Sequence, residues 1–325
     1  MIDVELRDLK KINIGFIGAG SHAKKLISVF QSYPNTFVSK VYKPNMLDKN
    51  ARDTDQIDDL IDCDAIVIAS PNNTHHHYLD WASANFKGYV FCEKPPVNNL
   101  RGLISFEKLN FQKSFFGFNL RFSDFNILSK KYFSSGELGE LMHFSASVGY
   151  GFAYKSSYAN SWKSCATRSP LGVIENLAIH YLDLAVCLFG NITSISVKKM
   201  NFAKSGGVPD TANIQAVHQD GKTSSIMVSY STPLINNLNL IASNGIVSID
   251  DSVLTIRSPR DVFDQNGLFI KPPIIDEVKY HGDEFFETSI MRQIEYFLNV
   301  VASKGTFERS EFDQSQHICN VLLNS

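Results

Sequence analysis

The chain lacks long apolar runs, and none approaches the roughly 18 residues that a membrane-spanning helix needs. Its first residues, MIDVELRDLKK, are charged and contain no apolar signal region. It also lacks a long basic block, and its 31 Lys and Arg against 33 Asp and Glu give a formal net charge of only −2. We therefore expect neither a membrane nor a nucleic acid as a partner.

Cysteine is scarce and scattered. The five cysteines lie far apart, at positions 63, 92, 165, 187 and 319. An odd, dispersed set is typical of reduced thiols, so we expect a cytoplasmic protein without disulfides. Three consecutive histidines, His75 to His77, would point in different directions on a helix, so we expect no metal site there.

With 325 residues, 44% of them apolar, the chain is long enough for about two domains with sizeable cores. From Lys11 to Leu120, short apolar runs alternate with helical stretches, which predicts a parallel sheet with helices on both faces. After Arg121, two helices and a run of strands separated by turns favour an α+β domain with a mostly antiparallel sheet. We predict one domain at residues 1–121 and another at residues 122–325.

Glycines mark the turn after the first predicted strand, in the sequence GFIGAGSHAKK. Gly18, Gly20 and Ala23 give the spacing G-x-G-x-x-A between a strand and a helix. The first glycine permits a tight turn, the second lets a pyrophosphate approach the backbone, and the small third residue lets helix and strand pack closely. Ser21 and His22 begin the helix, whose first N–H groups attract phosphates. This context favours a dinucleotide site over an ordinary tight turn.

The residue expected to bind the ribose lies about 20 positions further on, at the end of the second strand. An acid there would bind the 2′-hydroxyl of NAD(H), but the sequence VYKPN has Lys43 instead. Because an ammonium attracts a 2′-phosphate, Lys43 favours NADP(H) over NAD(H). In the alternative interpretation Lys43 points to solvent and Asp48 or another group holds the ribose.

A lysine stands between an acid and two prolines in the sequence FCEKPP, directly after a predicted strand. Doubly wound sheets bind ligands at the edge where the carboxyl ends of their strands lie. Pro95 restricts Lys94 to extended conformations, and the bond between them can also be cis. A lysine held near a nicotinamide can stabilise a developing alkoxide. By itself, however, Glu93-Lys94-Pro95 is more typical of an ordinary surface turn.

Five blocks taken in order resemble the glucose-fructose oxidoreductase / inositol dehydrogenase / MocA (Gfo/Idh/MocA) family. They are the glycine-rich turn, PNNTHHHYLDWA, GYVFCEKP, GFNLRF and GVIENLAIHYLDLAVCLFG. The resemblance covers most of residues 11–190, whereas the last third matches only in its strand pattern and final helix. It implies an N-terminal Rossmann domain with a doubly wound parallel sheet, followed by an α+β domain with a large, open-faced, mostly antiparallel sheet. It also implies oxidation of a hydroxyl, or reduction of a ketone, on a sugar, cyclitol or sugar-nucleotide.

The family's catalytic lysine corresponds to Lys94, and its aspartate and histidine fall on Asn176 and His180. At α-helical spacing, Asn176, His180 and Asp183 would share one polar face of an otherwise apolar helix. His180 would accept a proton while Lys94 polarises the oxygen, or the two would exchange these roles. Asparagine in place of aspartate carries no charge, so the pKa of His180 should be less elevated than in relatives with the acid.

Further candidates follow the predicted strand ends or match family positions. We assign to the cofactor site Ser70, Pro71, Asn72, His75, Glu93 and Lys94. Trp162 and Lys163 form an aromatic–basic pair that the resemblance places near substrate, although a solvated lysine is a comparable interpretation. Arg121 either lines the cleft or caps a helix.

These features predict an NAD(P)-dependent oxidoreductase acting on a polyhydroxylated small molecule. A dehydratase or epimerase-like enzyme that recycles the nicotinamide is an alternative, and a non-catalytic NAD(P)-binding sensor is another. The substrate and the direction of reaction stay open, because specificity depends on side chains that no local pattern exposes. An open-faced sheet often pairs with a copy of itself, so we expect a homodimer or homotetramer.

Overall fold

The structure, a computed structural model, describes residues 11–44 and 50–324. Asp48, the alternative ribose-binding acid, lies outside the described residues. The chain divides into two compact units: unit 1 runs to Gly117 and includes Met291–Cys319, whereas unit 2 comprises Phe118–Ile290 and the residues from Asn320 onward. The chain first passes from unit 1 to unit 2 after Gly117, near the boundary proposed at Arg121. Residues 291–319 then return to unit 1, which a single boundary in the sequence does not describe.

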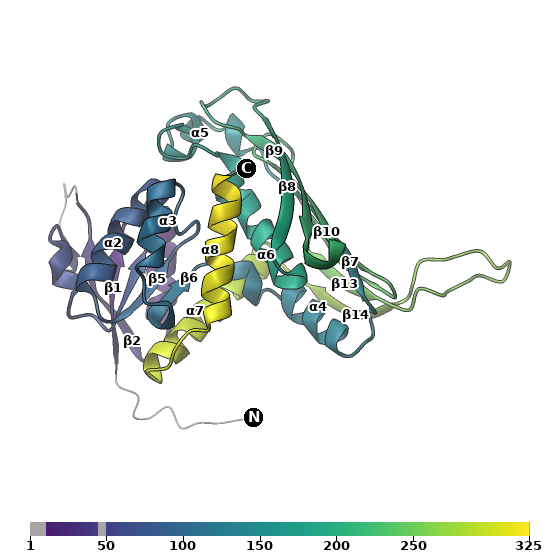
Figure 1. Ribbon diagram of the computed structural model, residues 1–325, viewed down its shortest axis with the longest axis horizontal. Helices are drawn as coiled ribbons and strands as arrows, with labels where there is room; N and C mark the ends of the chain where they lie inside the picture. Colours follow the sequence, from purple (N-terminus) through teal and green to yellow (C-terminus); the bar gives the residue numbers. More distant parts are fainter. Residues whose placement is uncertain (1–10, 45–49, 325) are drawn as a thin grey trace. The chain divides into compact units, whose positions relative to one another are not determined.

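Unit 1 contains a six-stranded, entirely parallel sheet in the order β3-β2-β1-β4-β5-β6. The strands are β1 (Ile12–Ile17), β2 (Thr36–Tyr42), β3 (Asp53–Thr54), β4 (Ala65–Ile68), β5 (Tyr89–Cys92) and β6 (Ser114–Phe116). Its helices include α1 (Ser21–Ser32) and the neighbouring pair α2 (His75–Asn85) and α3 (Leu100–Glu107), which pack side by side (Figure 1). The predicted doubly wound sheet is confirmed, and its order reverses between β1 and β4.

Burial explains why these short segments form strands. Every residue of β4 and β5 is buried, as expected for a parallel sheet covered on both faces. On α1, Phe30 places its ring edge-on to Phe16 and Phe91, with centroids 5.6 and 6.0 Å away. The last part of α7 (Glu284–Ala302) adds Phe297, whose centroid lies 5.4 Å from that of Phe91. The core of unit 1 therefore needs residues from far along the chain.

Unit 2 contains an eight-stranded sheet in the order β14-β13-β12-β11-β7-β10-β9-β8. Only the pairing of β7 with β10 is parallel among its described strands, so the prediction of a mostly antiparallel sheet is confirmed. The strands are β7 (Leu141–Gly149), β8 (Ile192–Met200), β9 (Thr211–His218), β10 (Thr223–Ser229), β11 (Ile235–Ala242), β12 (Ile246–Asp250), β13 (Val253–Arg257) and β14 (Ile274–Lys279).

This sheet has one covered and one open face. Along β9, for example, Ile214 is buried while Gln215 is exposed, which is the alternation of a half-buried strand. The helices α4 (Asp124–Ser134) and α6 (Ile179–Phe189) pack against the sheet (Figure 1). The short helix α5 (Ser156–Ala159) follows β7.

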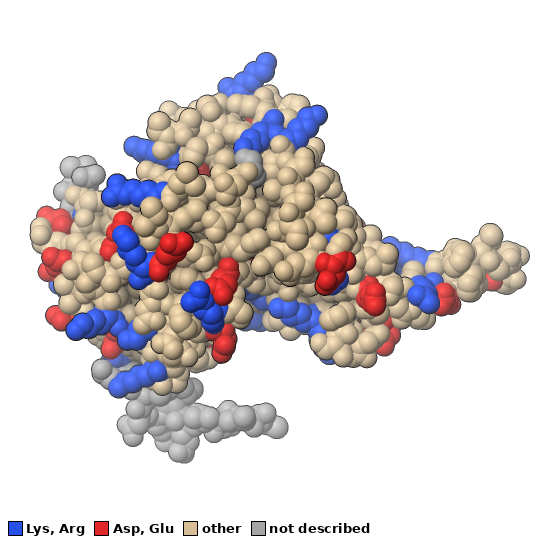
Figure 2. All heavy atoms as spheres, in the orientation of Figure 1, with Lys and Arg blue, Asp and Glu red and all other residues tan. Residues whose placement is uncertain are grey.

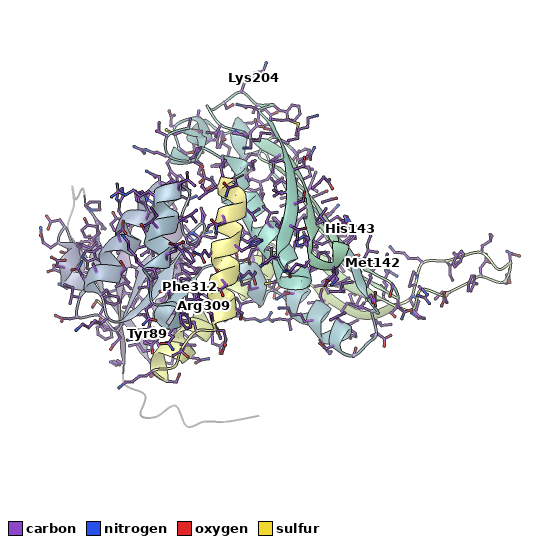
Figure 3. The ribbon with its side chains drawn as sticks, in the orientation of Figure 1. Tyr89, Met142, His143, Lys204, Arg309 and Phe312 are labelled. Atoms are coloured by element: carbon purple, nitrogen blue, oxygen red, sulfur yellow. The ribbon has the colours of Figure 1, made fainter. Side chains whose placement is uncertain are left out.

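Three elements near the end of the chain were not predicted from the sequence: β13, β14 and α8 (Arg309–Leu323). The connection between β13 and β14 projects from the sheet as a long loop (Figure 1). On α8, Phe312 packs 4.6 Å from the ring of Phe106, and Figure 3 labels it beside Arg309 of the same helix. No helix among the described residues is both long and apolar enough to cross a membrane.

Candidate active site

The turn after β1 has the geometry of a phosphate cradle. Gly18 has a φ of +111°, and a Cβ there would lie 2.7 Å from the carbonyl oxygen of Ala69, so the backbone requires glycine. A Cβ at Gly20 would meet no atom within 4 Å, which leaves open space before α1. No side chain caps the start of this helix, where Ser21 and His22 are exposed, whereas Ala23 is fully buried. The residues present therefore fit the phosphates of a dinucleotide.

Other candidates follow the neighbouring strands at the same sheet edge. Because β1, β4 and β5 are parallel, Gly18, Ser70 and Glu93 all follow carboxyl ends of strands. The hydroxyl of Ser70 pairs with that of Thr74 at 2.7 Å. Pro71 precedes the short helical turn that carries the buried Asn72. The sequence prediction and the fold thus agree that these segments lie along one edge of the sheet.

Lys43 forms an ion pair that the sequence reasoning missed. Its ammonium contacts the carboxylate of Asp53 on β3, and the side chain of Asp53 is only 4% exposed. Burial opposes the charge of this carboxyl, but the contacts from Lys43 and Asn50 hold the pKa of Asp53 below its ordinary value. A phosphate that approached Lys43 would therefore compete with a carboxylate already bound to it.

A buried carboxylate lies beside Lys94. Glu93 is 6% exposed, and its Oε1 lies 3.3 Å from Nε2 of His22. Burial opposes the charge, yet the positive groups around it, with His22 first and then Lys94 and His75, hold the pKa of Glu93 below its ordinary value. Lys94 itself is half-buried, and the Lys94–Pro95 peptide bond is cis. The loop therefore has a fixed charge arrangement and is not a solvated surface turn.

His75 joins two of these segments. The ring is fully buried, with Nδ1 2.8 Å from the carbonyl oxygen of Pro95 and Nε2 2.9 Å from that of Ser70. Both ring nitrogens therefore face backbone carbonyls and not open space. This arrangement gives His75 a means of holding the Lys94 loop, and it leaves a direct contact with a dinucleotide as an untested prediction.

In unit 2, the candidate helix begins with a π-helical segment, Ile174–Ala178, and becomes α-helical at Ile179. The predicted common face of residues 176, 180 and 183 assumed α-helical spacing, which applies only from Ile179 onward. Such π-helical turns are often found at functional sites. The side-chain nitrogen of Asn176 donates to Ser169 Oγ and to the carbonyl oxygen of Gly172, both at 2.8 Å.

The three residues of the predicted polar face have different environments, and Glu175 of the same helix is also fully buried. Asn176 is 7% exposed, His180 is half-buried, and Asp183 is fully buried. The guanidinium of Arg121 donates to both oxygens of Asp183, at 2.9 and 2.6 Å, and lies 4.7 Å from the ring of Phe118. Arg121 is therefore a structural partner of the candidate helix, and the two roles predicted for it stay predictions.

Trp162 and Lys163 lie in a short helical turn, and both are half-buried. The ammonium of Lys163 lies 5.6 Å from the ring centre of Phe152 and 5.8 Å from that of Trp162. Lys163 is thus partly withdrawn from solvent, and its contact with a substrate stays a prediction. Ser169, Asp53 and Phe152 all contact predicted site residues, yet no motif in the sequence distinguishes them. Among the described residues, no group of three His, Cys, Asp or Glu side chains has the arrangement of a metal site.

Comparison with known protein families gives two matches. A model described as the oxidoreductase family with an NAD-binding Rossmann fold matches residues 12–109. A model described as the GFO/IDH/MocA C-terminal domain matches residues 128–248. The two matches cover most of the parallel sheet and the first part of the open-faced sheet.

Two of the curated proteins with similar sequences are named as dehydrogenases. Levoglucosan dehydrogenase of Pseudarthrobacter phenanthrenivorans is 23% identical over 58% of this chain and 54% of its own length. Inositol 2-dehydrogenase of Rhizobium meliloti is 26% identical over 55% of each chain. The matched part thus spans about half the length of these relatives.

Solved structures share the fold over nearly the whole chain. Levoglucosan dehydrogenase in complex with NADH and levoglucosan has a TM-score of 0.82 at 16% identity, covering 97% of this chain and 96% of its own. An oxidoreductase from Agrobacterium radiobacter in complex with NAD+, L-tartaric acid and magnesium has a TM-score of 0.76 at 18% identity, covering 97% and 95%. At these identities the likeness establishes the fold.

Proposed function

Because the chain belongs to the GFO/IDH/MocA family of oxidoreductases, we propose that it transfers hydride between a nicotinamide cofactor and a hydroxyl or ketone carbon. The substrate class that fits best is a sugar, a cyclitol or a sugar-nucleotide. The observation that carries the proposal lies within unit 1: Lys94 follows β5 at the same sheet edge where Gly18 and Gly20 form the phosphate cradle. Relatives named as sugar and inositol dehydrogenases support the same class.

In this proposal the residues of the glycine-rich turn hold the phosphates of the dinucleotide. The bound nicotinamide supplies the hydride acceptor or donor. The ammonium of Lys94 donates a hydrogen bond to the substrate oxygen and stabilises the charge that develops on it. His180 accepts the hydroxyl proton, or exchanges this role with Lys94. Asn176 supports this helix through its contacts with Ser169 and Gly172.

The preference for NADP(H) over NAD(H) is a finer part of the proposal. Lys43 supports it, because its side chain carries a positive charge after β2, at the predicted ribose position. The contact with Asp53 offsets part of that charge, so we expect a modest preference and not exclusive use of NADP(H). NADH is the cofactor in the levoglucosan dehydrogenase complexes, which concerns that protein alone.

A homodimer or homotetramer in the cytoplasm completes the proposal. The open face of the eight-stranded sheet supports self-association, since Met142 and Val217 are 53% and 40% exposed. Light scattering during size-exclusion chromatography would measure the mass. A strictly monomeric protein at all concentrations would contradict this part.

The function is tested by recording nicotinamide absorbance and fluorescence with the purified protein. We expect binding of reduced cofactor, followed by a redox change when the right sugar or cyclitol is added. Binding of cofactor without a redox change across a broad panel of sugars, cyclitols and sugar acids would favour the sensor interpretation. Product formation without net change in the nicotinamide would favour the dehydratase or epimerase-like alternative.

A further inference from the structure

One long stretch of unit 2 has no acidic residue. Between Glu140 and Glu175 the sequence contains lysine, arginine and histidine but neither Asp nor Glu. This acid-free stretch includes β7, α5 and the turn with Trp162 and Lys163. In Figure 2, most atoms in the upper part of this unit belong to uncharged residues, and the charged atoms visible there are mostly those of Lys and Arg. The local charge therefore favours an anion over a cation.

Lys163 is a cation of this stretch that lies against aromatic rings. Its ammonium lies 5.6 Å from the centre of the Phe152 ring and 5.8 Å from that of Trp162, within range of cation–π attraction. Across residues 11–44 and 50–324 it makes no ion pair with a carboxylate. Burial lowers the pKa of Lys163, and no charged neighbour adds to the shift. Burying an ammonium without a counter-charge costs free energy, and a bound anion would offset this cost by pairing with it.

Further aromatic rings pack around Phe152, one of the two rings that contact this lysine. Phe152 lies 5.1 Å from Tyr158 and 5.4 Å from Tyr230, and Tyr150 lies 5.3 Å from Tyr230. Tyr150 is 37% exposed, whereas Tyr158 and Tyr230 are each 1% exposed. Within the described part of the chain the hydroxyl of Tyr158 has no hydrogen-bond partner. The cluster therefore joins an accessible apolar ring surface to a buried polar atom.

Two acids act on this cluster: Asp210 on Tyr158, and the buried Glu175, which adds a smaller contribution to the raised pKa of Tyr230. Asp210 raises the pKa of Tyr158 after the larger effect of burial, so its charge is felt there. Its carboxylate, however, accepts hydrogen bonds from the backbone N–H groups of Phe202 and Ala203, at 3.0 and 2.7 Å, and from the hydroxyl of Thr211. The turn that follows Phe202 and Ala203 carries Lys204, which Figure 3 labels. Further along the same turn, the N–H of Gly207 donates to the carbonyl oxygen of Ser164 at 3.0 Å.

We propose that Lys163, together with Phe152, Trp162 and Tyr150, binds an anionic group of the substrate, so that the preferred substrate is an acidic sugar. The group is a carboxylate or a phosphate. This inference rests on the proposed function, because only an enzyme has a substrate. Binding of the anionic sugar, however, can be measured without turnover. The aromatic rings would cover the C–H faces of the sugar, and the ammonium would donate a charge-assisted hydrogen bond to the anion.

The test uses fluorescence, because Trp162 and Trp81 are the only two tryptophans in the chain. A Trp81→Phe protein retains Trp162 as the single reporter beside Lys163. The probes are D-glucuronate, D-glucose 6-phosphate and D-glucose, and the corresponding galactose series. We expect at least one acidic sugar to bind roughly ten- to hundredfold more tightly than its neutral parent, the size of one charge-assisted hydrogen bond.

Variants separate recognition from a purely structural role. Lys163→Met should abolish the preference for the acidic member, and Lys163→Arg should keep most of it. Lys155→Met is the matched control, since Lys155 is an exposed lysine in the same acid-free stretch. A lysine that only braces Phe152 and Trp162 would change the melting temperature on substitution but not the ratio of affinities.

The proposal is overturned if no acidic sugar binds more tightly than its neutral parent, or if Lys163→Met keeps the ratio. The carboxylate and phosphate probes distinguish the two sources of the anion. An acidic sugar that binds without any redox change of the nicotinamide would count against the proposed function while leaving this site intact. Turnover of neutral sugars alone would support the proposed function and would contradict the proposed anion site.

Discussion

The ring of His75 holds the backbone directly after Lys94, with Nδ1 2.8 Å from the carbonyl oxygen of Pro95. Its other nitrogen lies 2.9 Å from the carbonyl oxygen of Ser70, after the neighbouring strand. Carbonyl oxygens only accept hydrogen bonds, and a neutral imidazole has a single N–H, so the neutral ring donates to one of the two carbonyl oxygens at a time. One side chain thus connects the two loops that carry predicted cofactor and catalytic residues.

We first predict that His75→Phe impairs catalysis more than cofactor binding. Without the ring nitrogens the Lys94 loop loses its attachment, and a displacement of about 1 Å typically costs on the order of a hundredfold in rate. The measurements are kcat and the affinity for reduced nicotinamide. His77→Phe is the control, because His77 is exposed on the same helix. Equal kcat values for the two variants would contradict this role.

The same residue predicts a pH dependence of stability. Burial lowers the pKa of His75 below its ordinary value, although the two carbonyls and Glu93 oppose the shift, and Lys94 adds to it. The pKa of His76, the next residue on the helix, is lowered mainly by burial, and a positive charge on His75 adds a small further decrease. Since the unfolded ring takes up its proton near pH 6.5 and the folded ring does so lower, stability should fall as the pH drops below about 6.5. Urea unfolding should show a smaller fall for His75→Gln, and an equal fall would refute the assignment.

The second prediction concerns the buried pair of Arg121 and Asp183. The Asp183 side chain is fully buried, and Arg121 contacts both of its oxygens. Arg121→Met should lower the free energy of unfolding by about 3–5 kcal/mol, because it leaves an uncompensated buried charge. The double variant Arg121→Met, Asp183→Leu should recover much of this loss. If the single and double variants have the same urea midpoint, the pair does not stabilise the protein as proposed.

The third prediction concerns cofactor choice. Asp53→Asn should release the charge of Lys43 and raise the ratio of kcat/KM for NADPH to that for NADH, by up to about tenfold for one unpaired charge. Lys43→Ala should lower the same ratio. Both kinetic ratios can be measured without knowing the physiological direction, provided one substrate is turned over. A ratio that Lys43→Ala leaves unchanged would assign the ribose to another group.

The fourth prediction refines the role of Asn176. Its side-chain nitrogen donates to the carbonyl oxygen of Gly172, so Asn176→Asp would place a carboxylate oxygen against another acceptor. We expect a lower melting temperature and a raised pKa for the new acid. The cofactor affinity should stay the same while the pH–rate profile changes. An unaltered pH–rate profile would show that position 176 does not influence the proton transfer.

The fifth prediction tests the proposed catalytic pair. Lys94→Met and His180→Ala should each lower kcat/KM by at least about a hundredfold, the lower range for loss of a general acid or base. Binding of the nicotinamide should persist in His180→Ala. Should both variants retain full kcat/KM on the true substrate, the assignment of these residues would be wrong.

Much of the fold was predictable because local patterns dictate it. The run from Ala65 to Ile68 is apolar throughout and forms a strand buried on both sides, and Gly18 adopts the positive φ that its spacing implies. The family resemblance named Lys94, Asn176 and His180 as site residues, and their roles stay predictions. The π-helical turn was not predictable, since residues 174–178 have an ordinary helical composition.

Partners distant in sequence account for the rest. Asp53 pairs with Lys43, and Asp183 pairs with Arg121 across 62 positions, so neither contact follows from spacing. The desolvated state of Lys163 depends on Phe152, which nothing in its own segment identifies. Local sequence thus indicated candidate site residues, whereas the contacts that set their environment come from tertiary neighbours.

The return of residues 291–319 to unit 1 has a consequence for how the protein is made. The ring of Phe297 stacks on Phe307 at 5.8 Å and meets Phe91 of the parallel sheet, so the core of unit 1 is incomplete until the last part of the chain has been synthesised. When only the first 117 residues have left the ribosome, the aromatic rings of these strands are exposed to solvent, because residues 291–319 are not yet available to pack on them. We expect a fragment ending at Gly117 to be digested rapidly by protease, and addition of a separate peptide spanning residues 291–319 to protect it.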